Sequence, residues 1–292
     1  MKGLIRFCIG LVVLAAVTGC SETAEPGNHH APPVSSATVP GDLTYQDVLQ
    51  KGEAVHSLAM TDDATIWVGT TAGLYRSTGS GLWASFSPQI ESDDVTGWYI
   101  DPADPQHIYI GGSGTMKVSV DGGKSWKPMT DGLPDAPDIR SITGVRKDGE
   151  LRLYAAVSGE GVYLSRNGGK WEKWQSLDQE IYMIDYDPAE ERMYVATQYG
   201  LFHDEQDRWE QEQLPDAEQV YSLAADDRDG TIYVATEQGV LQKRDGAWTP
   251  LEAKAPERLV VIAQGAGDTQ LVGIGESAYL YALQDGKWTK RE

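Results

Sequence analysis

The sequence predicts an all-β fold: a six-bladed β-propeller of four-stranded antiparallel blades, preceded by a signal peptide and a flexible tether. Three observations lead to this prediction. The 32 Gly, 14 Tyr and 9 Trp among 292 residues suit many short strands joined by tight turns. A strand–turn–strand pattern repeats six times along the chain. A tryptophan closes each repeat at intervals of 38–45 residues, which is the period of propeller blades.

Residues 1–19 have the form of a secretory signal peptide. Lys2 and Arg6 precede an apolar run, residues 9–17, that is too short to span a bilayer. The following Val-Thr-Gly-Cys, ending at Cys20, resembles the lipobox of bacterial lipoproteins. The resemblance implies that Cys20 is lipidated and becomes the first mature residue. We therefore expect an extracytoplasmic protein, anchored on the outer face of the cytoplasmic membrane or, in a Gram-negative cell, to the outer membrane. The alternative is an ordinary secretory signal with a coincidental cysteine.

Residues 20–42 contain the lipidated cysteine and a disordered tether, because Ser, Pro, Gly, Ala and Thr dominate and apolar periodicity is absent. A random coil of this length reaches about 25 Å, which keeps the domain near the membrane. His29 and His30 lie here, and a single histidine pair on a flexible segment binds metal weakly.

The charge balance excludes one class of partner. The chain has 44 acidic and 24 basic residues, and removal of residues 1–19 leaves 22 basic ones. A protein this acidic is a poor partner for nucleic acid or bare anionic lipid. Both cysteines, Cys8 and Cys20, precede the propeller, which therefore has neither a disulfide nor a cysteine metal site.

The propeller is predicted to span residues 43–292, with blades at approximately 54–90, 94–134, 138–177, 180–215, 219–253 and 258–292. Each repeat contains two apolar strands, a Gly-bearing turn, a third strand and a hairpin whose tryptophan opens the fourth strand. These tryptophans are Trp83, Trp126, Trp171, Trp209, Trp248 and Trp288. One repeat cannot bury both faces of its sheet, so neighbouring blades must cover it. For ring closure, residues 288–292 supply a short last strand, and residues 43–49 are a candidate to pair beside it.

The hairpin of the second repeat carries a recognisable motif. Residues 119–126, Ser-Val-Asp-Gly-Gly-Lys-Ser-Trp, match S-x-D-x-G-x-x-W, and residues 165–171 are a shorter copy with Asn in place of Asp. This resembles the Asp-box, or bacterial neuraminidase repeat, of sialidases, sortilin-type receptors and photosystem II assembly factors, which are propellers like those of YVTN repeats. We expect structural roles, with a carboxylate accepting N–H groups, Gly at positive φ and Trp packing beneath, for Ser119, Asp121, Gly123, Trp126, Ser165, Asn167, Gly169 and Trp171.

Catalytic chemistry is not indicated. Sialidases with these boxes need an Arg cluster, a Tyr nucleophile with a Glu base, and an Asp acid; here the family's early Arg-Ile-Pro motif is missing and the arginines are scattered. Phosphate loops, nucleophile elbows and zinc helix motifs are absent from the sequence. His56, His107 and His203 fall at different strand positions, so we predict no catalytic residues, metal or cofactor.

A binding site is expected at one mouth of the central channel. We call the second residue of each first strand the rim position; it is polar in five of six repeats although its neighbours are apolar, which a buried core would not favour. Its occupants are His56, Thr96, Arg140, Tyr182, Tyr221 and Val260, and nearby loops add Gln198, Tyr199 and Glu237. Either these side chains plug a solvated channel, or the tyrosines anchor a ligand with Arg140 as the charge partner.

The leading functional hypothesis is a membrane-anchored binding or assembly module for a protein or ligand of the cell envelope, as the photosystem factors that it resembles assist assembly. A glycan-active hydrolase or lyase is the first alternative, and a solute- or metal-sensing binding protein is the second. A carboxylate pair about 5–10 Å apart at the mouth, beside an Arg or Tyr, would favour the hydrolase.

Overall fold

The computed structural model describes residues 41–79, 81–217 and 219–291. The predicted signal peptide, Cys20 and the tether up to residue 40 lie outside the described residues, as do His29 and His30. Within the described part of the chain, the helices are too short and too polar to cross a membrane.

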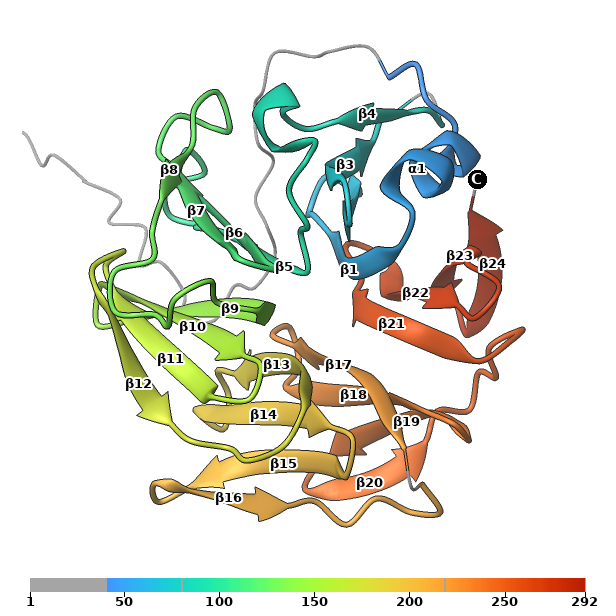
Figure 1. Cartoon of the computed structure of the whole chain (residues 1–292). Coiled ribbons are helices and arrows are strands. Elements are labelled where there is room, and N and C mark those ends of the chain that lie inside the picture. Colours follow the sequence, from blue (N-terminus) through green and yellow to red (C-terminus); the bar gives the residue numbers. More distant parts are fainter. Residues whose placement is uncertain (1–40, 80, 218, 292) are drawn as a thin grey trace, which may run out of the picture.

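Six four-stranded antiparallel sheets surround a central axis, which confirms the predicted propeller (Figure 1). Blades 1 to 3 contain β1 (Val55–Met60), β2 (Ile66–Thr70), β3 (Gly73–Ser77), β4 (Trp83–Ser85), β5 (Gly97–Ile100), β6 (Ile108–Gly112), β7 (Thr115–Ser119), β8 (Lys127–Pro128), β9 (Ile139–Lys147), β10 (Glu150–Val157), β11 (Gly161–Arg166) and β12 (Trp171–Gln175). Blades 4 to 6 contain β13 (Ile181–Asp187), β14 (Arg192–Thr197), β15 (Gly200–Glu205), β16 (Arg208–Gln211), β17 (Val220–Asp226), β18 (Thr231–Thr236), β19 (Gly239–Arg244), β20 (Ala247–Pro250), β21 (Leu259–Gln264), β22 (Thr269–Gly275), β23 (Leu280–Gln284) and β24 (Lys287–Arg291).

The second strand of each blade explains why the blades assemble into a ring. Strands β2, β6 and β18 are buried along their whole length, as expected for apolar strands covered on both faces. The covering side chains come from the next blade: Tyr99 and Tyr109 of blade 2, for example, share a cluster with Ile139 and Leu153 of blade 3. The core is therefore a set of interfaces between blades.

Ring closure differs from the sequence-based expectation. Residues 43–49 do not form a strand beside β24; Leu43 makes a single antiparallel bridge with Trp83 on blade 1, and α1 (Tyr45–Gly52) follows. The helix begins there because Thr44 and Asp47 form a capping box in which each side chain accepts the other's backbone N–H. Each blade is thus built from one uninterrupted stretch of chain, and no strand is exchanged at the seam between blades 1 and 6.

The repeating tryptophans fasten each blade to the blade before it. In blades 2 to 6 the indole N–H donates to the segment that leaves the preceding blade, at 2.9–3.1 Å. The acceptors are Ser87 Oγ for Trp126, Met129 O for Trp171, Ser176 O for Trp209, Glu212 Oε2 for Trp248 and Ala253 O for Trp288.

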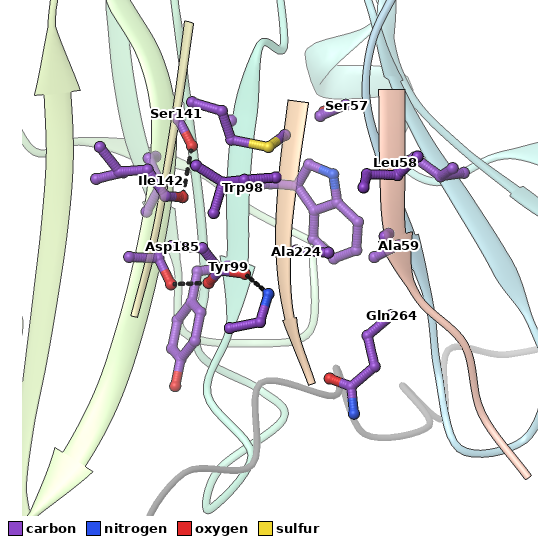
Figure 2. A pocket seen from close by; sticks show the side chains of 18 of the residues that line it. Ser57, Leu58, Ala59, Trp98, Tyr99, Ser141, Ile142, Asp185, Ala224 and Gln264 are labelled. Atoms are coloured by element: carbon purple, nitrogen blue, oxygen red, sulfur yellow. Dashed lines mark hydrogen bonds between the residues drawn. The ribbon is translucent and has the colours of Figure 1, made fainter. Parts of the chain in front are cut away.

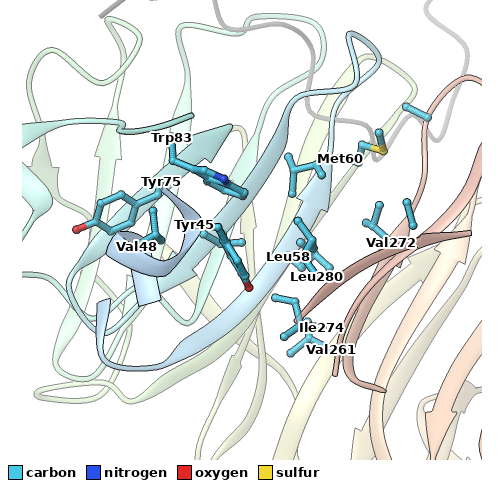
Figure 3. Packing of buried hydrophobic residues seen from close by; sticks show 14 residues of the cluster. Tyr45, Val48, Leu58, Met60, Tyr75, Trp83, Val261, Val272, Ile274 and Leu280 are labelled. Carbon is cyan, nitrogen blue, oxygen red and sulfur yellow. The ribbon is translucent and has the colours of Figure 1, made fainter. Parts of the chain in front are cut away.

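Blade 1 is the first blade along the chain, so Trp83 has no segment leaving an earlier blade to contact. The helix α1 occupies the corresponding position (Figure 3). The ring of Trp83 packs against that of Tyr45 with centroids 5.2 Å apart, and the Trp83 indole N–H is buried without a partner. Tyr45 and Val48 share a cluster with Leu58 of blade 1 and Ile274 of blade 6. The helix therefore joins the two ends of the ring.

A buried aspartate ends the first strand, or directly follows it, in three blades. In each case one carboxylate oxygen accepts the N–H two residues later: Asp101 from Ala103, Asp187 from Ala189, and Asp226 from Arg228. The second oxygen differs between the blades. Asp101 pairs with Arg146 and Asp226 with Arg228, whereas no described residue donates a hydrogen bond to the buried Oδ2 of Asp187.

This difference predicts a pH-dependent effect of Asp187→Asn. Burial raises the pKa of Asp187 above its ordinary value of 3.8, and the side chain is 1% exposed. Protonated Asp187 contributes stability that is fully present below the pKa of the unfolded state and is lost as the pH rises through the pKa of the folded state. At neutral pH the buried side chain is charged, and this charge destabilises the fold. We therefore expect Asp187→Asn to stabilise the fold at pH 7, and we expect this gain to disappear as the pH falls below the ordinary aspartate pKa of 3.8, where Asp187 is protonated in both states. Urea unfolding at several pH values measures it.

Asp226→Asn is the matched control, because that carboxylate has an arginine partner. This variant is expected to lose stability at pH 7, since the charge of Arg228 is left without its bidentate acceptor. A loss of stability in Asp187→Asn as large as that in Asp226→Asn would contradict the interpretation.

Candidate functional site

The rim position is set by a recurring β-bulge. In blades 1, 3, 4, 5 and 6 the register between the first two strands shifts by one residue and leaves the rim residue without a partner. The residues that are left out are His56, Arg140, Tyr182, Tyr221 and Val260. A bulge leaves one extra residue unpaired, and the side chain of this residue departs from the regular alternation between the two faces of the sheet. The polar position seen in the sequence therefore has a structural cause.

Three rim side chains connect neighbouring blades at the mouth. Each contacts a residue in the segment that leads into the first strand of the next blade. His56 Nε2 lies 3.3 Å from Asp94 Oδ1, Arg140 Nη2 lies 3.2 Å from Glu180 Oε1, and Arg258 Nη1 donates to the Tyr221 hydroxyl at 3.3 Å. Part of the rim is therefore engaged in holding the blades together.

Two further rim residues contribute little accessible surface. Thr96 is buried, and its hydroxyl lies within hydrogen-bond reach of the carbonyls of Gly111 and Ile139. Strand β5 begins one residue later, at Gly97, and has no bulge. Val260 packs against the cluster at the seam. Thr96 therefore does not join the open part of the mouth.

The tyrosines of blade 4 are the most accessible part of the predicted site. Tyr182 is 43% exposed and Tyr199 is 62% exposed, and Gln198, which precedes Tyr199 in the turn between β14 and β15, is also exposed. Glu237 lies in the corresponding turn of blade 5, where its carboxylate accepts the N–H of Gln219 at 2.9 Å. We call Tyr182, Gln198, Tyr199, Tyr221 and Glu237 the tyrosine patch.

Tyr279 is an exposed aromatic residue at this end that the sequence argument missed. It is 38% exposed and lies in the turn between β22 and β23, which corresponds to the turn of Tyr199 in blade 4. The ammonium of Lys290 lies 3.2 Å from the centre of its ring. Both turns contain a tyrosine, and this was the signal in the sequence. The turn of blade 6 is longer, so an alignment of the repeats does not bring Tyr279 and Tyr199 to the same position.

A carboxylate pair also lies at the mouth. Nη2 of Arg140 is 3.0 Å from Asp138 Oδ2 and 3.2 Å from Glu180 Oε1, so these two oxygens lie within about 6 Å of each other. The Nε–H of Arg140 is buried without a hydrogen-bond partner. The arrangement holds two carboxylates beside an arginine, close to the bulge that carries Tyr182.

Below the mouth the channel narrows and contains a cavity of about 130 Å³. Each blade contributes one apolar side chain to a surrounding ring, which consists of Leu58, Trp98, Ile142, Ile184, Leu223 and Ile262. Figure 2 shows the indole of Trp98 within this space, with Ile142 on one side and Leu58 on the other. Among the described residues, no group of three or more His, Asp or Glu side chains is placed to hold a metal ion.

The Asp-box of blade 2 is held together by its own side chains. The Asp121 carboxylate accepts from the N–H and hydroxyl of Ser125 at 2.9 and 2.6 Å and from the Ser119 hydroxyl at 2.8 Å. These bonds, led by that of the Ser125 hydroxyl, lower the pKa of Asp121 to about 2. Gly123 has φ +86° and lies against Phe86, and Trp126 reaches blade 1. These contacts support the predicted structural role.

The shorter copy in blade 3 uses different contacts. The Asn167 side-chain oxygen accepts the N–H of Leu151 on β10 at 3.0 Å rather than bridging its own hairpin, and Asn167 adopts φ +52°. The Ser165 hydroxyl donates to the carbonyl of Gly169 at 2.7 Å. Trp171 is fully buried and donates to blade 2. Both hairpins lie on outer strands, away from the channel (Figure 1).

No family model and no curated protein matches the sequence. The structure is similar to the GH74 xyloglucanase from Xanthomonas campestris (TM-score 0.60, 13% identity, covering 86% of this chain and 48% of that one). It is also similar to virginiamycin B lyase from Staphylococcus aureus (TM-score 0.58, 12% identity, 83% and 85% covered) and to YCF48 bound to D1 peptide (TM-score 0.57, 17% identity, 81% and 81% covered). The chain spans less than half the length of the three GH74 enzymes that it matches. At these identities the similarity establishes the fold, a β-propeller shared by hydrolases, a lyase and a peptide-bound protein.

Proposed function

We propose that this protein is an extracytoplasmic binding module that is anchored to a membrane through Cys20 and holds a protein partner at the channel mouth. The observation that carries the proposal is the β-bulge that recurs in five of the six blades, together with the exposure of Tyr182 and Tyr199 in blade 4. Exposed tyrosines supply a large contact area at low entropic cost and are frequent interface hot spots. The resemblance of residues 119–126 and 165–171 to Asp-boxes, which assembly-factor propellers also carry, supports this proposal.

Partner capture with purified mature protein tests the role of the tyrosine patch. Tyr182→Ala combined with Tyr199→Ala is expected to weaken capture by at least about thirty-fold, because loss of an aromatic hot spot costs about 2 kcal/mol or more. Val120→Ala is the matched control, since Val120 is also apolar and 52% exposed but lies on the Asp-box hairpin. The partner is identified from the membranes of the producing cell and then titrated in purified form.

Three outcomes decide the proposal. Equal affinity of the purified partner for the double variant and the wild type would place the interface elsewhere. Unchanged urea unfolding of both variants would exclude loss of folding as the cause of weaker capture. Membrane release of a Cys20→Ser variant tests the anchor separately, because that substitution leaves the propeller unaltered.

A glycan-active hydrolase remains the second candidate, and the Asp138–Glu180 pair is the observation that favours it. Retaining glycosidases hold their carboxyl groups about 5–5.5 Å apart, and the contacts to Arg140 keep one oxygen of Asp138 and one of Glu180 within about 6 Å of each other. Xyloglucan and other β-glucans are the substrates to screen. Turnover that disappears in both Asp138→Asn and Glu180→Gln would establish this function, whereas turnover that persists in both would exclude this pair as its source.

A further inference from the structure

Small residues of three inner strands line the channel cavity. Ala59, Ala224 and Ala263 each follow a residue of the apolar ring, and all three line the cavity. At the equivalent position, blade 3 has Thr143 and blade 4 has Asp185. The layer below the apolar ring therefore combines three small residues with a hydroxyl group, one carboxylate and, from blade 2, the buried side chain of Tyr99 (Figure 2).

Asp185 is the one charged side chain among the residues that line this cavity. Its Oδ1 accepts from the Thr143 hydroxyl at 3.1 Å and the Tyr186 N–H at 2.9 Å, and its Oδ2 accepts the Ala225 N–H at 2.8 Å. All three donors are neutral. Among the ion pairs of the described residues none involves Asp185, in contrast to Asp101 and Asp226. Asp185 is partly buried and lines a largely apolar cavity, and a carboxylate in such surroundings is stabilised by a cationic partner.

We propose that the cavity binds a primary alkylammonium group. The ammonium pairs with Asp185, and its aliphatic chain lies in the apolar ring against the face of Trp98. An indole face attracts a cation and packs favourably against methylene groups. A bare metal ion fits less well, because hard cations require about six oxygen ligands and the remaining lining is mostly apolar. A chain of about four carbons, as in a lysine side chain, spans the distance of two to three strand residues from the ring to the mouth.

This inference goes beyond the proposed function, because most of the rim does not line the cavity. Tyr182, Tyr199 and Arg140 are absent from the cavity wall, whereas Asp185 and the three alanines belong to it. Loss of partner capture at the rim and loss of amine binding in the channel are therefore separable. Two kinds of ligand carry an alkylammonium group: a free alkylamine, and a polypeptide whose lysine side chain enters from the mouth.

A ligand-detected NMR titration with n-butylamine, fully protonated at pH 7, tests the proposal. Millimolar binding is expected for so small a ligand, with at least ten-fold weaker binding of the uncharged n-butanol. Asp185→Asn should weaken butylammonium binding at least ten-fold. Asp148→Asn, at an exposed turn of blade 3, is the matched control and should leave the binding unchanged.

Ala263→Leu provides a test that leaves the carboxylate in place. The larger side chain takes up part of the cavity that Asp185 also lines, so it should abolish binding of butylammonium and butanol alike. Urea unfolding of each variant distinguishes a lost site from a lost fold. Absence of butylammonium binding to the wild type, equal binding of butanol, or binding that is unaffected by both Asp185→Asn and Ala263→Leu would each overturn the proposal.

The source of the amine is decided with a peptide. A pentapeptide with a central lysine should bind, and its acetyl-lysine counterpart should not, if a lysine side chain enters the channel. The Tyr182→Ala, Tyr199→Ala variant should then bind the peptide more weakly but butylammonium normally. Binding of butylammonium without binding of the peptide assigns the cavity to free amines.

Discussion

Replacement of Trp83 by alanine is expected to lower the free energy of unfolding by about 3–5 kcal/mol, the range for large-to-small changes at buried aromatic residues. Trp83 is 1% exposed and packs against Tyr45 of α1, where other blades have the exit segment of a predecessor. Its removal leaves a cavity at the seam between blades 1 and 6. Urea unfolding, followed by circular dichroism, measures the loss.

The equivalent change on another blade provides the control. Trp209 of blade 4 is half-buried and forms one hydrogen bond to Ser176, so Trp209→Ala should cost clearly less. Tyr45→Ala removes the other side of the same contact, and a double-mutant cycle of Tyr45 with Trp83 should give a coupling energy of about 1 kcal/mol or more. Equal losses for the two tryptophans, with no coupling to Tyr45, would show that α1 does not close the ring.

Arg146→Ala is expected to cost a similar amount, about 3–5 kcal/mol, because it leaves a buried carboxylate without its counter-ion. Arg146 Nε and Nη2 reach the two oxygens of Asp101 at 2.9 and 2.5 Å, and the Asp101 side chain is almost fully buried. The bidentate pair joins blade 3 to blade 2. This bond also raises the pKa of Arg146, which stays charged.

The neighbouring Lys147 supplies the control for Arg146. Its ammonium lies 2.6 Å from Glu191, but the pair is solvent-exposed, and Lys147→Ala should cost at most about 1 kcal/mol. Asp101→Asn in the Arg146→Ala background should restore part of the lost stability, because the unpaired charge is then absent. A failure of this second substitution to restore stability would mean that lost packing of the arginine stem, rather than charge, explains the effect.

The sequence predicted the blades well because their signals are local. A strand, a turn and a closing tryptophan are each visible within about ten residues, and the blades keep all four strands contiguous. The helix α1 was missed although Thr44 and Asp47 carry its capping signal. Eight residues make too few turns for helical periodicity to be distinguished from a short strand, and the seam that stabilises this helix is formed by residues from the far end of the chain.

The site was predicted in position but not in detail. Repeat alignment located the rim residues, yet it did not reveal that bulges orient them, because a register shift depends on how two strands pair. It also did not distinguish the buried Thr96 from the exposed Tyr182. The cavity was invisible for a similar reason: Ala59, Ala224 and Ala263 are unremarkable alone, and they leave space only when three separate blades meet.

The absence of strand exchange at the seam has a consequence for how the chain folds as it is made. Every blade can pair its four strands as soon as its own residues have emerged from the ribosome, since each uses one continuous segment. Blade 1 nevertheless waits for blade 6, more than 150 residues later, before its inner strand is covered. During this interval α1, which is synthesised first, shields part of the apolar flank of blade 1 from premature association.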